Sequence, residues 1–158
     1  MLTTPPKQIL FVCLGNICRS PMAENIMNHL VAQAGLSERI VCDSAGTASY
    51  HVGNPPDRRM LAAAHKRGIP MQGRARQFIR EDFEHFDLIL AMDRANYHSI
   101  LALDPERHYQ HKVKLMCGFC QKSTEQEVPD PYYGGPEGFN DVIDLLQDAC
   151  SGLLQQLR

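Results

Sequence analysis

VCLGNICRS, residues 12–20, closes a continuous apolar run near the N-terminus and decides the fold expected for this chain. The run itself, from Gln8 to Cys13, is partly β-branched, which is typical of a strand buried on both faces of a parallel sheet. Ser20 and Pro21 suit the N-cap and the first position of a helix, and apolar residues at helical spacing follow them. The stretch is therefore predicted to be the loop between a first strand and a first helix.

Strand and helix patterns alternate along the rest of the chain. Strands are predicted at residues 39–43, 87–92 and 113–116, and helices at 21–34, 59–66, 94–103 and along an apolar stripe at 142–157. The alternation indicates a single-domain α/β fold, with a doubly wound, four-stranded parallel sheet and helices on both of its faces. Residues 117–139 form one long stretch without periodicity, and long irregular segments inside compact domains are usually functional.

Composition limits the partners that the chain can have. With 18 acidic and 16 basic side chains the net charge is −2, so the chain lacks the strong positive field that nucleic acids or anionic membranes require. The first apolar run is too short for a signal sequence or a membrane span, and without a secretory signal the six cysteines are expected to be reduced thiols. We predict a cytoplasmic protein, a monomer or weak dimer, that binds neither nucleic acid nor membrane.

The loop of residues 12–20 has the chemistry of an anion site. Backbone N–H groups of residues 14–18, followed by a helix N-terminus, can converge on one tetrahedral anion, and Gly15 and Asn16 accept the left-handed dihedral angles that such a curl needs. Arg19 adds a planar fork that can hold two phosphate oxygens. The same positive field favours a thiolate at Cys13, so this loop is predicted to be a phosphate loop with a nucleophilic cysteine.

A second segment can supply the proton that such chemistry requires. Hydrolysis of an aryl phosphate ester needs an acid for the leaving oxygen, on the side opposite the nucleophile. DPYYGG, residues 130–135, places Asp130 beside two tyrosines in the long irregular stretch, although Asp-Pro with Gly-Gly also makes an ordinary turn. Asp130 is the candidate acid.

Together these segments resemble the low-molecular-weight protein tyrosine phosphatase family. VCLGNICRSPMAE and DPYYGG carry the resemblance, and DSAGT (43–47), GIPMQGRARQ (68–77) and FDLILAMD (86–93) match the family in order and spacing. The resemblance covers essentially the whole chain and implies one phosphatase domain over residues 1–158. It also implies phosphotyrosine-containing proteins as substrates, and neither a metal nor another cofactor.

The resemblance assigns roles to individual residues. It implies Cys13 as nucleophile, Arg19 as phosphate clamp, and Asp130 as general acid in the first step and general base in the second. It further implies that Ser20 donates a hydrogen bond to the thiolate and that Asn16 supports the strained loop backbone. The other phosphate-loop positions are Leu14, Gly15, Ile17 and Cys18. The resemblance implies that Tyr50, Tyr132 and Tyr133 form the walls of the substrate cleft. It also implies that Asp93 supports the loop from outside, and some relatives carry a supporting histidine at the position of Gly73.

Three other functions compete with this interpretation. Thioredoxin-coupled arsenate reductases share the fold and loop but need further cysteines, and residues 75–100 contain none. Protein arginine phosphatases on the same scaffold carry threonine where this chain has Ile17. A zinc-binding module would use two histidines and two cysteines from a segment in which a buried strand is also predicted, namely His108, His111, Cys117 and Cys120.

Cys18 is a candidate redox partner for Cys13. Peroxide attacks a thiolate, so Cys13 is expected to oxidise first, and a thiol five residues away on a curled loop can reach disulfide distance. The alternative is that Cys18 is a small residue that fills the back wall of the loop.

Overall fold

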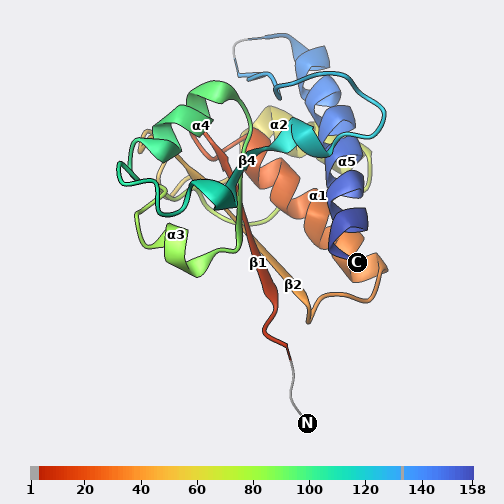
Figure 1. Ribbon diagram of the computed structural model, residues 1–158. Coiled ribbons are helices and arrows are strands. Elements are labelled where there is room, and N and C mark those ends of the chain that lie inside the picture. The colour runs from red at the N-terminus through yellow and green to blue at the C-terminus, as the bar shows by residue number, and fades with distance from the viewer. Residues whose placement is uncertain (1–3, 133) are drawn as a thin grey trace.

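The structure is a computed structural model that describes residues 4–132 and 134–158. Four strands form one parallel sheet in the order β2-β1-β3-β4 (Figure 1). The strands are β1 (Lys7–Cys13), β2 (Ile40–Gly46), β3 (Leu88–Ala91) and β4 (Val113–Leu115). The predicted α/β fold with a four-stranded parallel sheet is confirmed.

Helices cover both faces of the sheet (Figure 1). They are α1 (Arg19–Gln33), α2 (Arg58–Lys66), α3 (Asp82–His85), α4 (Arg94–Leu101) and α5 (Pro136–Leu157), with short 3₁₀ turns η1 (Gln110–Lys112) and η2 (Met116–Phe119). The long helices α1 and α5 pack together on one face, and α3 and α4 lie on the other. Among the described helices, none is both long enough and apolar enough to cross a membrane.

Strand β1 lies at the centre of the core. Its side chains alternate, so that Ile9 and Phe11 join the cluster under α1 and α5, while Leu10 and Val12 join the cluster under α4, and all four are fully buried. Burial on both faces explains why this strand is a continuous apolar run rather than an alternating one.

The topology places the loop after β1 at a ligand-binding position. The chain passes from β1 to β2 on one side and later returns to place β3 on the other side of β1. Ligands of doubly wound sheets bind at such a reversal, beyond the carboxyl ends of the strands. Val128 of the long irregular segment donates its backbone N–H to the carbonyl of Met92 just after β3, at 2.8 Å, which brings the segment that carries Asp130 to the same edge.

Several element boundaries differ from the prediction. Strand β2 extends to Gly46, because Ser44 and Ala45 stay in register with β1. Helix α1 begins at Arg19 with no side-chain cap, so the prediction that Ser20 caps it is wrong; the Ser20 hydroxyl is engaged elsewhere, as described below. The irregular stretch is shorter than predicted, since η2 ends at Phe119 and α5 begins at Pro136. The four-residue α3 and the two 3₁₀ turns are too short to show a helical period in the sequence.

Candidate active site

The phosphate loop is a tight curl held against β2. Asn16 adopts a positive φ of 58°, the left-handed conformation that asparagine tolerates. Gly46 lets the loop approach, because a Cβ at that position would lie 2.8 Å from the Leu14 carbonyl oxygen. The Cys13 and Leu14 carbonyls accept backbone hydrogen bonds from Thr47 and Ala48, both at 2.9 Å. These contacts fix the path of the loop between β1 and α1.

The sulfur of Cys13 lies at the focus of this curl. The Ser20 Oγ is 3.0 Å from the Cys13 Sγ, and the Asn16 backbone N–H donates to the same sulfur at 3.3 Å. The Asn16 side-chain Nδ2 donates to Ser20 Oγ at 2.8 Å and to Ser44 Oγ at 3.0 Å. Because Ser20 Oγ accepts a hydrogen bond from Asn16, its own proton is available to the sulfur. The Asn16 N–H and the Ser20 hydroxyl are thus both placed to donate to the Cys13 sulfur.

Arg19 joins the loop to the segment that carries the candidate acid. Its Nη1 donates to Asp93 Oδ2 at 2.6 Å and to the Val128 carbonyl at 3.0 Å, and its Nη2 lies 3.5 Å from Asp130 Oδ2. Burial lowers the pKa of Arg19, but the charge of Cys13 and the hydrogen bond to Asp93 outweigh it and raise the pKa. The guanidinium therefore stays charged although it is buried.

These groups enclose a cavity of about 80 Å³ above the loop. Cys13 and Arg19 line it from the loop side, and Asp130 and Tyr132 line it from the long irregular segment. The remaining lining residues are Leu14, Gly15, Ile17, Cys18, Tyr50 and His51. Tyr50 is 75% exposed and so stands at the rim rather than inside. The predicted wall residue Tyr133 lies outside the described residues.

His51 lines the cavity although the sequence analysis did not single it out. Its ring packs against the rings of Tyr50 and Tyr132, with centroids 6.5 and 6.1 Å apart. Its Cδ2 would lie 3.0 Å from a Cβ at Gly15, so glycine there leaves room for the imidazole. A histidine in a loop has no periodicity, and its adjacency to Tyr50 was the only available signal.

Arg59 holds the Tyr132 side of the cavity and was also missed. Its Nη1 donates to the Tyr132 carbonyl at 2.9 Å, and its guanidinium lies 5.1 Å from the ring centroid of Tyr132 and 4.8 Å from that of Phe139. Asp57 pairs with Arg59 at 3.0 Å and donates its own backbone N–H to the Ile17 carbonyl at 2.8 Å. Helix α2 is thereby tied to both the phosphate loop and the cleft wall.

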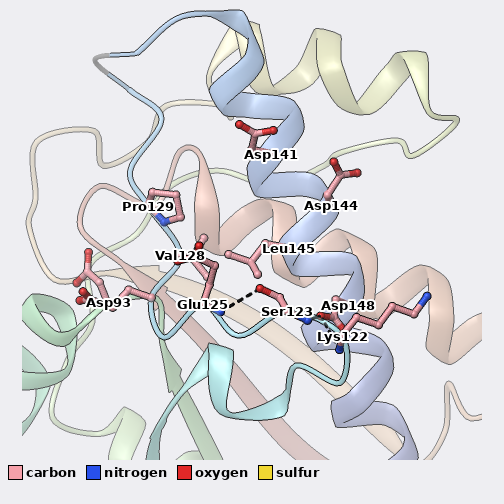
Figure 2. A pocket seen from close by; sticks show the side chains of 11 residues that line it. Asp93, Lys122, Ser123, Glu125, Val128, Pro129, Asp141, Asp144, Leu145 and Asp148 are labelled. Atoms are coloured by element: carbon pink, nitrogen blue, oxygen red, sulfur yellow. Dashed lines mark hydrogen bonds between the residues drawn. The ribbon is translucent and has the colours of Figure 1, made fainter.

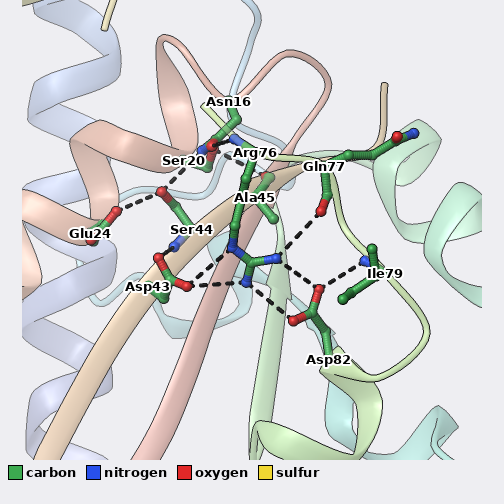
Figure 3. Close-up of polar contacts among 10 residues, drawn as sticks. All are labelled: Asn16, Ser20, Glu24, Asp43, Ser44, Ala45, Arg76, Gln77, Ile79 and Asp82. Carbon is green, nitrogen blue, oxygen red and sulfur yellow. Dashed lines mark hydrogen bonds and ion pairs between the residues drawn. The ribbon is translucent and has the colours of Figure 1, made fainter. Parts of the chain in front are cut away.

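A polar network extends behind the loop (Figure 3). Ser44 donates to Glu24 Oε1 at 2.6 Å, which continues the hydrogen bonds from Asn16. Burial raises the pKa of Glu24 to about 7, against the opposing hydrogen bond from Ser44. DSAGT contributed to the family resemblance, but nothing in the sequence connected Ser44 or Glu24 with the loop.

A larger hollow, of about 840 Å³, lies between residues 122–129 and α5 (Figure 2). One lysine and six carboxylates line it: Lys122, Asp93, Glu125, Glu127, Asp141, Asp144 and Asp148. Like charges repel a phosphate ester there despite the greater volume. The small cavity above Cys13, which is lined by the positively charged Arg19, is therefore the candidate site.

The alternative zinc site is not assembled. Across residues 4–132 and 134–158, no three side chains of His, Cys, Asp or Glu lie close enough together to hold a metal ion, and His108 pairs with Glu106 instead. His108, His111, Cys117 and Cys120 thus do not form a common ligand set.

Comparison with known proteins identifies close relatives of the chain. Residues 8–158 match the family model described as low molecular weight phosphotyrosine protein phosphatase. A protein of Synechocystis sp. named as a low molecular weight protein-tyrosine-phosphatase is 65% identical over 150 residues, covering 95% of this chain and 96% of that protein.

Solved structures with similar folds include phosphatases as well. A protein tyrosine phosphatase from Entamoeba histolytica superposes with a TM-score of 0.92 at 46% identity, covering 96% of each chain. A Drosophila arginine phosphatase superposes with a TM-score of 0.87 at 32% identity, covering 94% of this chain and 96% of that one.

Proposed function

The chain belongs to the low molecular weight phosphotyrosine protein phosphatase family and is a protein-tyrosine phosphatase, and on that premise we propose that it works through a covalent phosphocysteine intermediate on Cys13. The observation that carries the proposal is the surrounding of the Cys13 sulfur. Ser20 and Asn16 direct hydrogen bonds to it, and the Arg19 guanidinium lies at the other end of the same loop, between Asp93 and Asp130. The residues proposed as nucleophile, phosphate clamp and acid, namely Cys13, Arg19 and Asp130, all line one cavity, which supports the proposal.

In the first step the Cys13 thiolate attacks phosphorus and the bond to the tyrosine oxygen breaks. The N–H groups of residues 14–18 and the Arg19 fork stabilise the phosphoryl oxygens as charge shifts to them. Asp130 gives its proton to the leaving phenol oxygen. In the second step Asp130, now a carboxylate, takes a proton from water as the water attacks the phosphocysteine, which releases phosphate and restores the thiolate.

The walls of the cavity favour a flat aryl ester. Ile17 is 8% exposed and apolar, and the aromatic Tyr132 lines the same cavity, so the ring of phosphotyrosine can be held by stacking and apolar contact. The likeness to an arginine phosphatase keeps phosphoarginine as the second candidate substrate.

Matched peptides distinguish the two substrates. With chelator present, we expect the purified protein to release phosphate from a phosphotyrosine peptide at least about 10²-fold faster, in kcat/KM, than from the same peptide with phosphoarginine, since aromatic contact and the acid both serve a phenol leaving group. The measurement is initial phosphate release on both peptides. Equal rates would assign the enzyme to both substrates, and loss of activity with chelator would contradict a mechanism built on Cys13 alone.

We also propose that peroxide switches the enzyme off reversibly through Cys18. Cys18 is 4% exposed, and its burial, with the charges of Asp57 and Cys13, raises its thiol pKa strongly. Cys13, with its two hydrogen-bond donors, is then the thiolate that peroxide oxidises to a sulfenic acid. Attack by Cys18 sulfur forms the disulfide and releases water, and two equivalents of a thiol reductant reverse it.

Cys18→Ser tests this switch. After the same peroxide dose and then dithiothreitol, the unmodified enzyme should regain most of its activity, while Cys18→Ser should regain little because its sulfenic acid proceeds to the irreversible sulfinic state. Mass spectrometry before reduction should show a Cys13 to Cys18 link. Equal recovery of both proteins, or a link from Cys13 to Cys42, Cys117 or Cys120, would contradict the proposal.

We further propose one phosphatase domain over residues 1–158 that acts in the cytoplasm as a monomer or weak dimer, without a metal, nucleic acid or membrane partner. The family match over residues 8–158 supports the single domain. All six cysteines are free thiols in the structure, which is consistent with a reducing compartment. Phosphotyrosine-containing proteins are the substrates that the family implies.

A further inference from the structure

The side-chain amide of Asn16 sets the direction of the hydrogen bonds that reach the nucleophile. Its Oδ1 accepts the backbone N–H of Arg76 at 3.0 Å. A backbone N–H can only donate, so the amide oxygen must face Arg76. Both hydrogens of Nδ2 are then directed at Ser20 and Ser44, so the Ser20 hydroxyl proton is left for the Cys13 sulfur at 3.0 Å or for the more distant Ala45 carbonyl at 3.4 Å, and the sulfur is the nearer acceptor.

Arg76 lies in an irregular segment, so no helix or strand fixes the position of its backbone N–H. Residues 69–76 contain no helix or strand, and the Arg76 carbonyl accepts the Gly46 N–H at 2.9 Å. A side-chain anchor of this segment is the Arg76 guanidinium, which lies between a carboxylate on β2 and a carboxylate on α3 (Figure 3).

Both carboxylates bind the guanidinium through two nitrogens. Asp43 Oδ2 accepts from Nε at 3.2 Å and from Nη2 at 3.1 Å, and Asp82 accepts from Nη1 at 3.1 Å and from Nη2 at 3.2 Å. Asp82 is 5% exposed and also accepts the Ile79 N–H at 2.9 Å, so its charge needs a cation in a defined position. The planar fork of arginine matches this geometry, and an ammonium does not.

We propose that Arg76 is a positioning residue for the nucleophile: its ion pairs with Asp43 and Asp82 hold its backbone N–H against the Asn16 amide and thereby direct the Ser20 hydroxyl at the Cys13 sulfur. The inference rests on the proposed function in that Cys13 is the nucleophile. It assigns to Arg76 no contact with substrate, because Arg76 is not among the described residues that line the cavity, and its guanidinium lies between the two carboxylates (Figure 3).

Arg76→Lys tests the proposal against the matched control Arg74→Lys. Arg74 lies two residues earlier in the same irregular segment, and its guanidinium donates to the Gly53 carbonyl rather than to either carboxylate. For Arg76→Lys we expect kcat on a phosphotyrosine peptide and the iodoacetamide alkylation rate of Cys13 at mildly acidic pH to fall together by about fivefold to tenfold, the worth of one hydrogen bond. Competitive inhibition by inorganic phosphate should change less than about twofold, because the backbone N–H groups and Arg19 are unchanged.

A second variant, Arg76→Ala, tests the same role without introducing a lysine. The Arg76 side chain is 34% exposed, so added guanidinium can enter the space left in Arg76→Ala. Guanidinium at millimolar concentration should restore part of the alkylation rate of Arg76→Ala and leave that of Arg74→Ala unchanged.

The outcomes separate this inference from the proposed function. If Cys13 of the unmodified enzyme is not the selectively alkylated cysteine, the proposed function fails. If Cys13 is selectively alkylated, two results would overturn the positioning role of Arg76. One is that Cys13 of Arg76→Lys is alkylated at the rate of the unmodified enzyme, and the other is that Arg76→Lys loses phosphate inhibition in proportion to its loss of kcat.

Discussion

Cys13→Ser should lower the turnover of a phosphotyrosine peptide by about 10⁵-fold or more, the scale on which enzymes respond to loss of their nucleophile. A serine hydroxyl is not ionised near neutral pH, and the donors that stabilise sulfur, Ser20 and the Asn16 N–H, are too few to produce an alkoxide. The variant should still bind inorganic phosphate, because the loop N–H groups and Arg19 remain.

The measurement combines steady-state kinetics with trapping of the intermediate. Acid quench of a reaction with a ³²P-labelled phosphotyrosine peptide should leave label on the unmodified protein and none on Cys13→Ser. Cys42→Ser is the control, because Cys42 lies on β2 outside the cavity; it should keep full turnover and label. Substantial turnover by Cys13→Ser would remove the phosphocysteine mechanism.

Asp130→Asn should lower turnover on phosphotyrosine by about 10² to 10⁴, the usual effect of losing a positioned proton donor. The carboxyl lines the cavity, lies 3.5 Å from Arg19 Nη2 and is oriented by the Tyr132 backbone N–H, which donates to Oδ1 at 3.0 Å. Asparagine can keep that hydrogen bond but has no proton to give.

The dependence on leaving group identifies the role of Asp130. A series of aryl phosphates with phenols of increasing acidity should show a shrinking loss, because an acidic phenol departs without a proton. Asp93→Asn is the matched control: Asp93 bonds Arg19 Nη1 and caps α4 through the Asn96 N–H, so its loss should be the same for every phenol. If Asp130→Asn also lowers all rates equally, Asp130 is not the acid.

The local chemistry of the site could be predicted from the sequence because its central residues are close in the chain. Cys13, Asn16 and Arg19 belong to one curl at a strand end, where residue type and position agree. Ser20 shows the limit of local preference: its capping preference favoured the helix end, but its hydroxyl contacts the nearby sulfur and the Asn16 amide, and only the family resemblance implied the contact with the sulfur.

Other parts of the site come from tertiary contacts that leave no local pattern. His51 reaches the cavity from a turn, and Arg59 reaches Tyr132 from α2 across 73 positions of sequence. Arg76 contacts Asn16 from a segment without periodicity, across 60 positions. In each case the contact depends on how the fold packs distant segments together, so no spacing along the chain predicts it.

The nucleophile Cys13 and the acid Asp130 differ in how firmly the fold holds the segments that carry them. Cys13 ends a strand that is paired on both sides, whereas residues 129–132, with Asp130, contain no helix or strand, and segments outside regular structure open at a lower free energy than core strands. Small local openings can therefore displace the acid while the sulfur keeps its hydrogen bonds. We expect ligands that bridge this segment to the loop to slow hydrogen exchange there more than in the sheet.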